Sequence, residues 1–414
     1  MDSLDDLLHK RFPQVRLAAM LISRKLKEYG VTLSEKQIQK LEHNLDLDHL
    51  ENLEIDLNDE QVSILRPLLN SETGKLPMEF DDEDLDSLES VVKKKVSKLL
   101  WRSIKETSSD LRNSWKTQAA EILKEQQEVR SSFESSLREI WGQGFDLLEM
   151  LCGVCLDAGS NFNKQFRPEA SVTNDFVFEA LTRLHARGCQ IGFEILALLK
   201  SGFADGAMAR WRTLHEIAVT SMLISNQGQQ IAERYLDHVL VTDYDDALHY
   251  QKHYNTLGFD PILPTDYAQM KADRDAVCQK YGPGFERDNG WAACVFNGRS
   301  PTFAQIEEYV NLQHLRPFYK LANNNIHAGS KGALMRLGEP LSGEDVLVAG
   351  PSLFGLADPG KNTAVSLQQI TVTLLLTKSG ISHLILSDAI ENLVVEVFDA
   401  FSLAEYKLEQ KSKS

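Results

Sequence analysis

Residues 201–225, SGFADGAMARWRTLHEIAVTSMLIS, are the stretch on which the predicted fold depends. Most of its helical surface is apolar, which predicts a helix buried on several sides. One stripe carries the ionisable residues Arg212, His215 and Glu216, because positions three and four apart share a face. An unpaired buried charge is costly, so we expect Arg212 to pair with Glu216. Two interpretations remain open: a structural ion pair that fixes helix register, or a polar pocket with chemistry or ligand binding in it.

The composition indicates what kinds of partner the chain has. Its 414 residues include 44 basic and 60 acidic side chains, for a net charge of −16. This balance argues against a general affinity for nucleic-acid backbone, although a local basic patch is compatible with it. The N-terminus is acidic, and no apolar run reaches the roughly 18 residues of a membrane span. We therefore expect a soluble, cytoplasmic protein without a membrane partner.

The first part of the chain, residues 1–135, predicts a helical arm. Gly30 ends one helix, and Ser34 with Gln37 forms a capping box for the next. Residues 85–140 contain neither proline nor glycine and carry spaced apolar residues, which predicts one or two long amphipathic helices as a helical hairpin or coiled-coil-like arm. Such an arm favours a protein partner or a homo-oligomer formed through the N-terminal helices.

The remainder, residues 136–414, predicts an antiparallel helical bundle. Helical segments follow one another with short Gly, Pro or Asn breaks: 137–158, 172–200, 201–225, 229–254, 302–327, 363–379 and 381–410. We expect an irregular insertion at 258–300, which is long enough to be functional or a lid. Residues 331–362 favour a small hairpin or extended flap. The predicted fold class is all-α.

One set of side chains has the composition of a catalytic site. If the helix that ends at His327 packs antiparallel to the central helix, Asn324 and His327 converge with Arg212, His215 and Glu216. Histidine acts as an acid or base near neutral pH, and arginine stabilises developing negative charge. That set suits metal-independent cleavage of RNA through the 2′-hydroxyl, with no cofactor. The alternative is that His327 merely caps a helix end.

Other patterns favour structure over chemistry. Asp245, His249 and His253 share one helix face, but a solvated polar stripe explains them better than a metal site does. Cys152 and Cys155 form a lone CxxC inside a helical pattern, which favours packing over redox or metal chemistry.

Three separated motifs carry a resemblance to a known family. Gly202–Glu216, Gly290–Ala292 and Tyr319–Ala328 together resemble the bacterial domain of unknown function family 5677, over roughly residues 170–340. This resemblance implies a helical fold and no particular activity.

A weaker likeness is to the HEPN superfamily of helical nucleic-acid-associated domains. Residues 321–329 look like its ribonuclease segment, with Asn324 and His327 in place but Ala322 or Asn323 where arginine is expected. Arg210 or Arg212 would then have to supply the charge. The likeness implies RNA binding or RNA cleavage in a defence or toxin setting.

Two functions are therefore weighed. The first is a HEPN-like protein that binds or cuts RNA, which needs Arg212 and His327 around one open pocket. The second is a non-catalytic interaction scaffold with a buried Arg–Glu pair, which tolerates these residues apart or fully buried.

Overall fold

The computed structural model describes residues 14–46, 53–339, 347–378 and 380–413. All regular secondary structure in these ranges is helical, which confirms the predicted all-α class. The chain divides into two compact units, Met1–Glu125 and Gln126–Ser414. Helix α5 (Asp82–Thr173) contributes residues to both, and the boundary predicted near residue 135 lies on this helix.

The first unit is a small cluster of helices on the start of α5. It comprises α2 (Gln14–Glu28), α3 (Glu35–Asn44), α4 (Asp59–Leu65) and the 3-10 turn η2 (Arg66–Leu68). Gly30 has φ +87° after α2, and Ser34 and Gln37 form the expected capping box. Its buried core consists of Ala19, Ile22, Leu26, Val31, Leu33, Leu41, Leu45 and Leu65.

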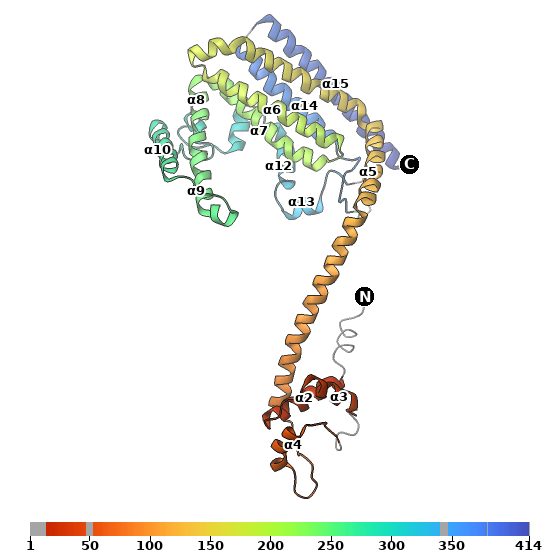
Figure 1. The fold of residues 1–414 in the computed structure, drawn as a ribbon. Coiled ribbons are helices and arrows are strands. Elements are labelled where there is room, and N and C mark those ends of the chain that lie inside the picture. Colours follow the sequence, from red (N-terminus) through yellow and green to blue (C-terminus); the bar gives the residue numbers. More distant parts are fainter. Residues whose placement is uncertain (1–13, 47–52, 340–346, 379, 414) are drawn as a thin grey trace. The chain divides into compact units, whose positions relative to one another are not determined.

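Helix α5 is a single element of 92 residues (Figure 1). The sequence predicts separate helices before and after about residue 137 and leaves residues 159–171 between two helices, but the structure has no break at either place. The reason is that the region before residue 137 lacks helix-ending residues, while the glycines that follow are accommodated within the helix. The helix ends before Asn174, which adopts the left-handed conformation at φ +52°.

The second unit is the predicted bundle. The later part of α5 packs with α6 (Phe176–Lys200), α7 (Ala204–Gln227), α14 (Ala357–Leu375) and α15 (Ile381–Lys413) (Figure 1). Short turns join α5 to α6 and α6 to α7, so consecutive helices run antiparallel. Helix α7 is central, in contact with α6 and α14, and its Trp211 side chain is fully buried.

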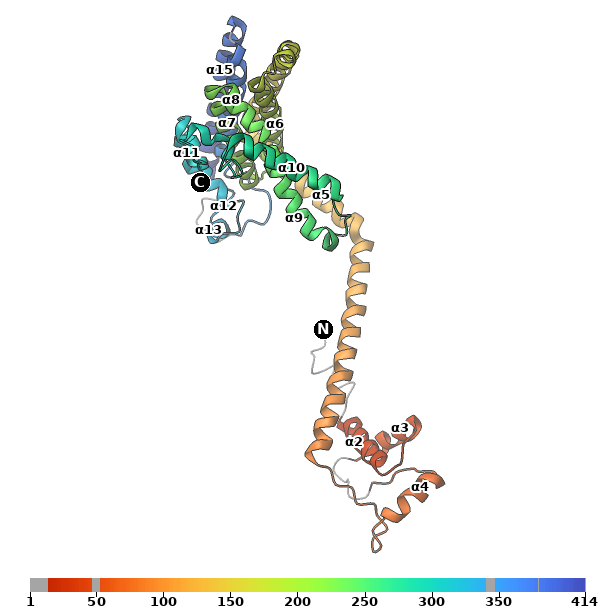
Figure 2. The same cartoon turned by 90° about the vertical axis from the view of Figure 1, so that its left-hand side faces the viewer.

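Shorter helices connect α7 to α14. They are α8 (Gln229–Asp237), α9 (Val239–Leu257), α10 (Pro264–Tyr281), η3 (Gly290–Val295), α11 (Phe303–Tyr309), η4 (Gln313–Leu315), α12 (Arg316–Asn324) and α13 (Ser330–Leu334); η5 (Leu376–Lys378) follows α14. Figure 2 shows α9 and α10 side by side, in agreement with their contacts.

Three predicted segments differ from the structure here. The stretch 258–300 is less irregular than expected, because Pro264 occupies the first turn of α10, where its missing N–H is tolerated. The single helix predicted for 302–327 is divided, since Asn311 is left-handed at φ +61° and Pro317 opens α12. The described part of 331–362 contains α13 and no strand, so the hairpin prediction is wrong for these residues.

No helix in the part of the chain that the structure describes has both the length and the apolar character needed to cross a membrane.

Candidate functional site

Arg212 and Glu216 form the ion pair predicted from their spacing on α7. The Nε atom of Arg212 lies 3.1 Å from Oε1 of Glu216. The Tyr319 hydroxyl of α12 donates to the same carboxylate oxygen at 2.6 Å, and the Arg212 guanidinium lies 4.8 Å from the centre of the Tyr319 ring. The two charged side chains are 25% and 37% exposed, so this pair lies at the edge of the core and is partly solvated.

His215 lies deeper and belongs to a second polar pair. Its Nε2 atom is 2.8 Å from Oε1 of Glu307 on α11, and both side chains have no exposed surface. Arg316, at the start of α12, forms an ion pair with the other oxygen of Glu307. Among the described residues, Nδ1 of His215 has no hydrogen-bond partner, so Nε2 makes the polar contact of this ring. One buried carboxylate thus joins α7, α11 and α12.

Tyr319 connects the two pairs. The guanidinium groups of Arg212 and Arg316 lie 4.8 and 4.9 Å from its ring centre, and Phe303 stacks on the ring at 5.0 Å. Burial, followed by the hydrogen bond to Glu216, raises the pKa of Tyr319 to about 12. The phenol therefore stays protonated at neutral pH and acts as a hydrogen-bond donor. We call Arg212, His215, Glu216, Glu307, Arg316 and Tyr319 the α7 network.

Asn324 and His327 lie on another part of this region. Asn324 is the last residue of α12, and His327 follows the helix end with an exposed side chain. His327 donates its backbone N–H to the Asn323 carbonyl at 3.1 Å. Among the described residues, no hydrogen bond or ion pair joins either side chain to Arg212, His215 or Glu216. The structure thus brings three of the five predicted residues into one network, without linking the other two to it.

The prediction did not include Glu307, Arg316 or Tyr319. The sequence does contain a sign that Glu307 is buried. It shares one helix face with three apolar residues, Phe303, Ile306 and Val310. In the structure Ile306 and Val310 are buried. The sequence contains no comparable sign that Glu307 faces His215, which lies 92 positions earlier.

The glycine-rich start of α7 anchors a later segment of the chain. The Asp205 carboxylate accepts the backbone N–H of Leu337 at 3.0 Å, and the Gly202 carbonyl accepts that of Ser352 at 2.9 Å. Gly202 has φ +78°, and an added Cβ would lie 2.7 Å from the Phe133 ring. This motif is therefore explained by backbone conformation and close packing.

The candidate metal ligands do not form a centre. Within the described ranges, no group of three or more His, Cys, Asp or Glu side chains is placed to hold a metal ion. Asp245, His249 and His253 lie along α9, as the polar-stripe interpretation expects. Cys152 and Cys155 are fully buried in the bundle core.

Comparison with known proteins agrees with the first resemblance. No curated protein and no solved structure matches the chain. No match supports the weaker HEPN likeness. Residues 178–345, which contain α7, the α7 network and the Gly290–Ala292 motif, match the model of a family of unknown function, DUF5677.

Proposed function

We propose that the chain is a non-catalytic interaction scaffold that pairs with a second copy of itself through α5. The observation that carries the proposal is a row of exposed apolar side chains on that helix, here called the arm stripe: Trp101, Ile104, Leu111, Trp115 and Ile122. Each of these residues is between 37% and 64% exposed. Large exposed apolar patches on soluble proteins mark interaction sites.

The spacing of the arm stripe favours a coiled coil. With Ser108 and Gln118 included, successive positions alternate by three and four residues, as the seam of paired helices requires. Polar residues at isolated seam positions, such as Ser108, can set register at some expense of stability. From Trp101 to Ile122 the helix extends about 32 Å, or roughly three heptads.

The area of the arm stripe is sufficient for a dimer. At the exposures above, five side chains of this size offer roughly 500 Å² per copy. Two copies therefore remove about 1,000 Å² from water before flanking side chains are counted, which reaches the lower bound of a specific interface. Two copies present the same stripe, so the surface is self-complementary and needs no other partner.

The α7 network supports a structural role for the predicted polar cluster. His215 and Glu307 are completely buried and paired, which holds α7, α11 and α12 together. A scaffold accommodates such a network. RNA cleavage requires Arg212 and His327 around one open pocket, and among the described residues no hydrogen bond or ion pair joins His327 to the network.

Light scattering on the full chain tests the proposal. The chain has a mass of 46.6 kDa, and we expect a particle of twice that mass. Leu111→Glu with Trp115→Glu should give the monomer with unchanged helix content, because both residues are exposed. Asn113→Glu, on the opposite face of α5, serves as the matched control and should remain dimeric.

Two results would contradict the scaffold. The first is a monomeric wild-type chain at all concentrations. The second is RNA cleavage that His327→Ala abolishes while the arm-stripe variant retains it, which would establish the ribonuclease instead.

A further inference from the structure

A cavity of about 710 Å³ lies between α6, α8, the start of α9 and the η3 segment. This volume is within the range of small-molecule sites. Its lining combines charged and apolar side chains: Glu179, Arg183, Leu184, Arg187, Tyr235, Leu236, His238, Val239, Thr242, Asp288 and Trp291. The lining contains no residue of the α7 network, but it includes Trp291, the central residue of the Gly290–Ala292 motif. The scaffold function does not explain this motif.

One wall of the cavity is held in place by Arg234 of α8. This buried side chain donates from Nε to the Trp291 carbonyl at 2.9 Å and from Nη2 to the Gly290 carbonyl at 3.1 Å. Its guanidinium also lies 4.6 Å from the ring centre of Tyr281. His238, which lies between α8 and α9, has its Nε2 atom 3.0 Å from the Arg287 carbonyl and so attaches the same segment to the α8–α9 junction. The wall is therefore preformed, which lowers the entropic cost of binding a ligand.

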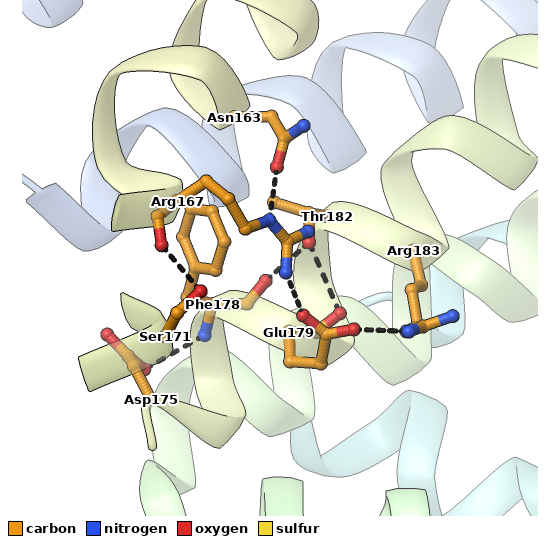
Figure 3. Close-up of polar contacts among 8 residues, drawn as sticks. All are labelled: Asn163, Arg167, Ser171, Asp175, Phe178, Glu179, Thr182 and Arg183. Carbon is orange, nitrogen blue, oxygen red and sulfur yellow. Dashed lines mark hydrogen bonds and ion pairs between the residues drawn. The ribbon is translucent and has the colours of Figure 1, made fainter. Parts of the chain in front are cut away.

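The cavity also has positive charge available to a ligand. Arg183 and Arg187 lie one turn apart on α6 and both line the cavity. The Glu179 carboxylate is shared by Arg167 and Arg183 (Figure 3), so one acid is set against two guanidinium groups. Arg187 donates to the neutral Gln190 side chain at 2.9 Å and forms no ion pair among the described residues. Of these arginines, Arg183 and Arg187 line the cavity, and Glu179 and Asp288 are the lining acids. Because Arg167 neutralises part of Glu179 from outside the lining, the Arg187 guanidinium is the charge most available to a ligand.

The apolar part of the lining favours a ligand that carries an apolar body as well as an anionic group. Tyr235 and Trp291 meet edge to face at 5.1 Å, and Leu184, Leu236 and Val239 extend the apolar surface. Guanidinium groups bind phosphate and carboxylate in a fixed fork geometry, whereas the apolar wall favours an aromatic or aliphatic body.

We propose that this cavity binds a small molecule with an apolar or aromatic body and one anionic group, which Arg187 and Arg183 hold. The anionic group is a phosphate or a carboxylate. This proposal does not depend on pairing through α5, because every lining residue belongs to the second unit.

Ligand-observed NMR on the full chain tests the site with simple probes. Phenyl phosphate and benzoate distinguish the two anionic groups, and we expect at least one of them to bind. Phenol and inorganic phosphate each lack one half of the proposed chemistry and should bind at least about tenfold more weakly, since a hydrogen bond to a charged group contributes that much.

Variants locate the binding. Arg187→Gln removes the guanidinium that holds the anionic group and should weaken binding of the probe about tenfold. Among the described residues Arg187 forms no ion pair, so the substitution should leave the fold intact. Val239→Trp should fill the cavity from its exposed edge and abolish binding. Arg299→Gln, an exposed arginine of the same unit outside the lining, is the control and should bind like wild type. Failure of both anionic probes, equal binding by inorganic phosphate alone, or undiminished binding to folded Arg187→Gln and Val239→Trp would overturn the proposal.

Discussion

Nε2 of His215 lies 2.8 Å from Oε1 of Glu307, and neither side chain has any exposed surface. A histidine inside an apolar helix is therefore matched by a carboxylate from a helix far along the chain. The second carboxylate oxygen is bound by Arg316, so the acid is compensated from two sides. This arrangement explains how ionisable groups are tolerated on the central helix of the bundle.

Removal of the Glu307 carboxylate should strongly destabilise the bundle. Glu307→Ala leaves Arg316 and His215 without their buried partner, and we expect a loss of about 3–5 kcal/mol in the free energy of unfolding. Urea denaturation measures this value. The neighbouring, exposed Glu308 gives the control Glu308→Ala, for which we expect no more than about 0.5 kcal/mol. Equal effects of the two substitutions would contradict the structural role.

Replacement of Glu216 should cost less than replacement of Glu307. Its side chain is 37% exposed, so water can solvate Arg212 and Tyr319 after the carboxylate is lost. We expect Glu216→Ala to destabilise the protein by about 1 kcal/mol. Urea denaturation of Glu216→Ala and Glu307→Ala measures both losses in the free energy of unfolding. A larger loss for Glu216→Ala would contradict this ranking.

The fold was largely predictable from periodicity and helix-ending residues. Gly30 and the Ser34–Gln37 capping box act locally, and the structure contains both as expected. Errors arose where a local signal was weak or conditional. Asn311 interrupts the predicted helix through a left-handed backbone, which the residue type allows but does not require. Pro264 begins a helix inside a stretch that its proline and glycine content made look irregular.

Acid should destabilise the protein through His185. This side chain is 4% exposed, with Nε2 3.1 Å from the Thr371 hydroxyl, and burial lowers its pKa from 6.5 to about 4. Below pH 6.5 His185 is protonated in the unfolded chain but stays neutral in the folded chain until the pH approaches 4. The free energy of unfolding therefore falls as the pH falls. The expected loss between pH 7 and pH 5 is about 2 kcal/mol.

Urea denaturation at both pH values measures this loss, with His185→Gln as the comparison. The variant retains a hydrogen-bonding group but does not titrate. Between pH 7 and pH 5 its free energy of unfolding should therefore fall by about 2 kcal/mol less than that of the wild type. The same pH dependence in both proteins would exclude His185 as the cause.

The CxxC cysteines should be inert in the folded protein. Burial raises the pKa of the Cys155 thiol to about 11, and it also raises that of Cys152. Because the thiolate is the reactive form, iodoacetamide should label the exposed Cys294 and leave these two unmodified until the protein unfolds. Mass spectrometry of the labelled peptides checks this, and fast labelling of Cys155 in the native protein would contradict it.

Gly290 should not tolerate a side chain. An added Cβ would lie 2.2 Å from the Phe285 carbonyl oxygen, a backbone atom that cannot move aside easily. We expect Gly290→Ala to destabilise the protein by about 3 kcal/mol, the upper end of overpacking costs. Gly153→Ala is the matched control, because nothing lies within 4 Å of its added Cβ. Thermal unfolding measures the stability of the two variants. Equal stability of Gly290→Ala and Gly153→Ala would contradict the close packing at Gly290.

The candidate site was only half predictable. The ion pair of Arg212 and Glu216 follows from spacing along one helix, which a sequence displays directly. The partner of His215 does not, because Glu307 reaches it through the packing of α11 against α7. The link assumed between His327 and the central helix likewise depended on a tertiary arrangement, and the end of α12 after Asn324 leaves His327 beyond the helix.

Amide hydrogen exchange along α5 tests the central claim, pairing through the arm stripe, most directly. A solvated helix without a partner exchanges rapidly, whereas a paired helix is protected in proportion to the dimer present. We predict that peptides covering residues 101–123 gain protection as the protein concentration rises, while core peptides from 145–158 stay unchanged. Equally fast exchange of residues 101–123 at low and high concentration would contradict pairing through this surface.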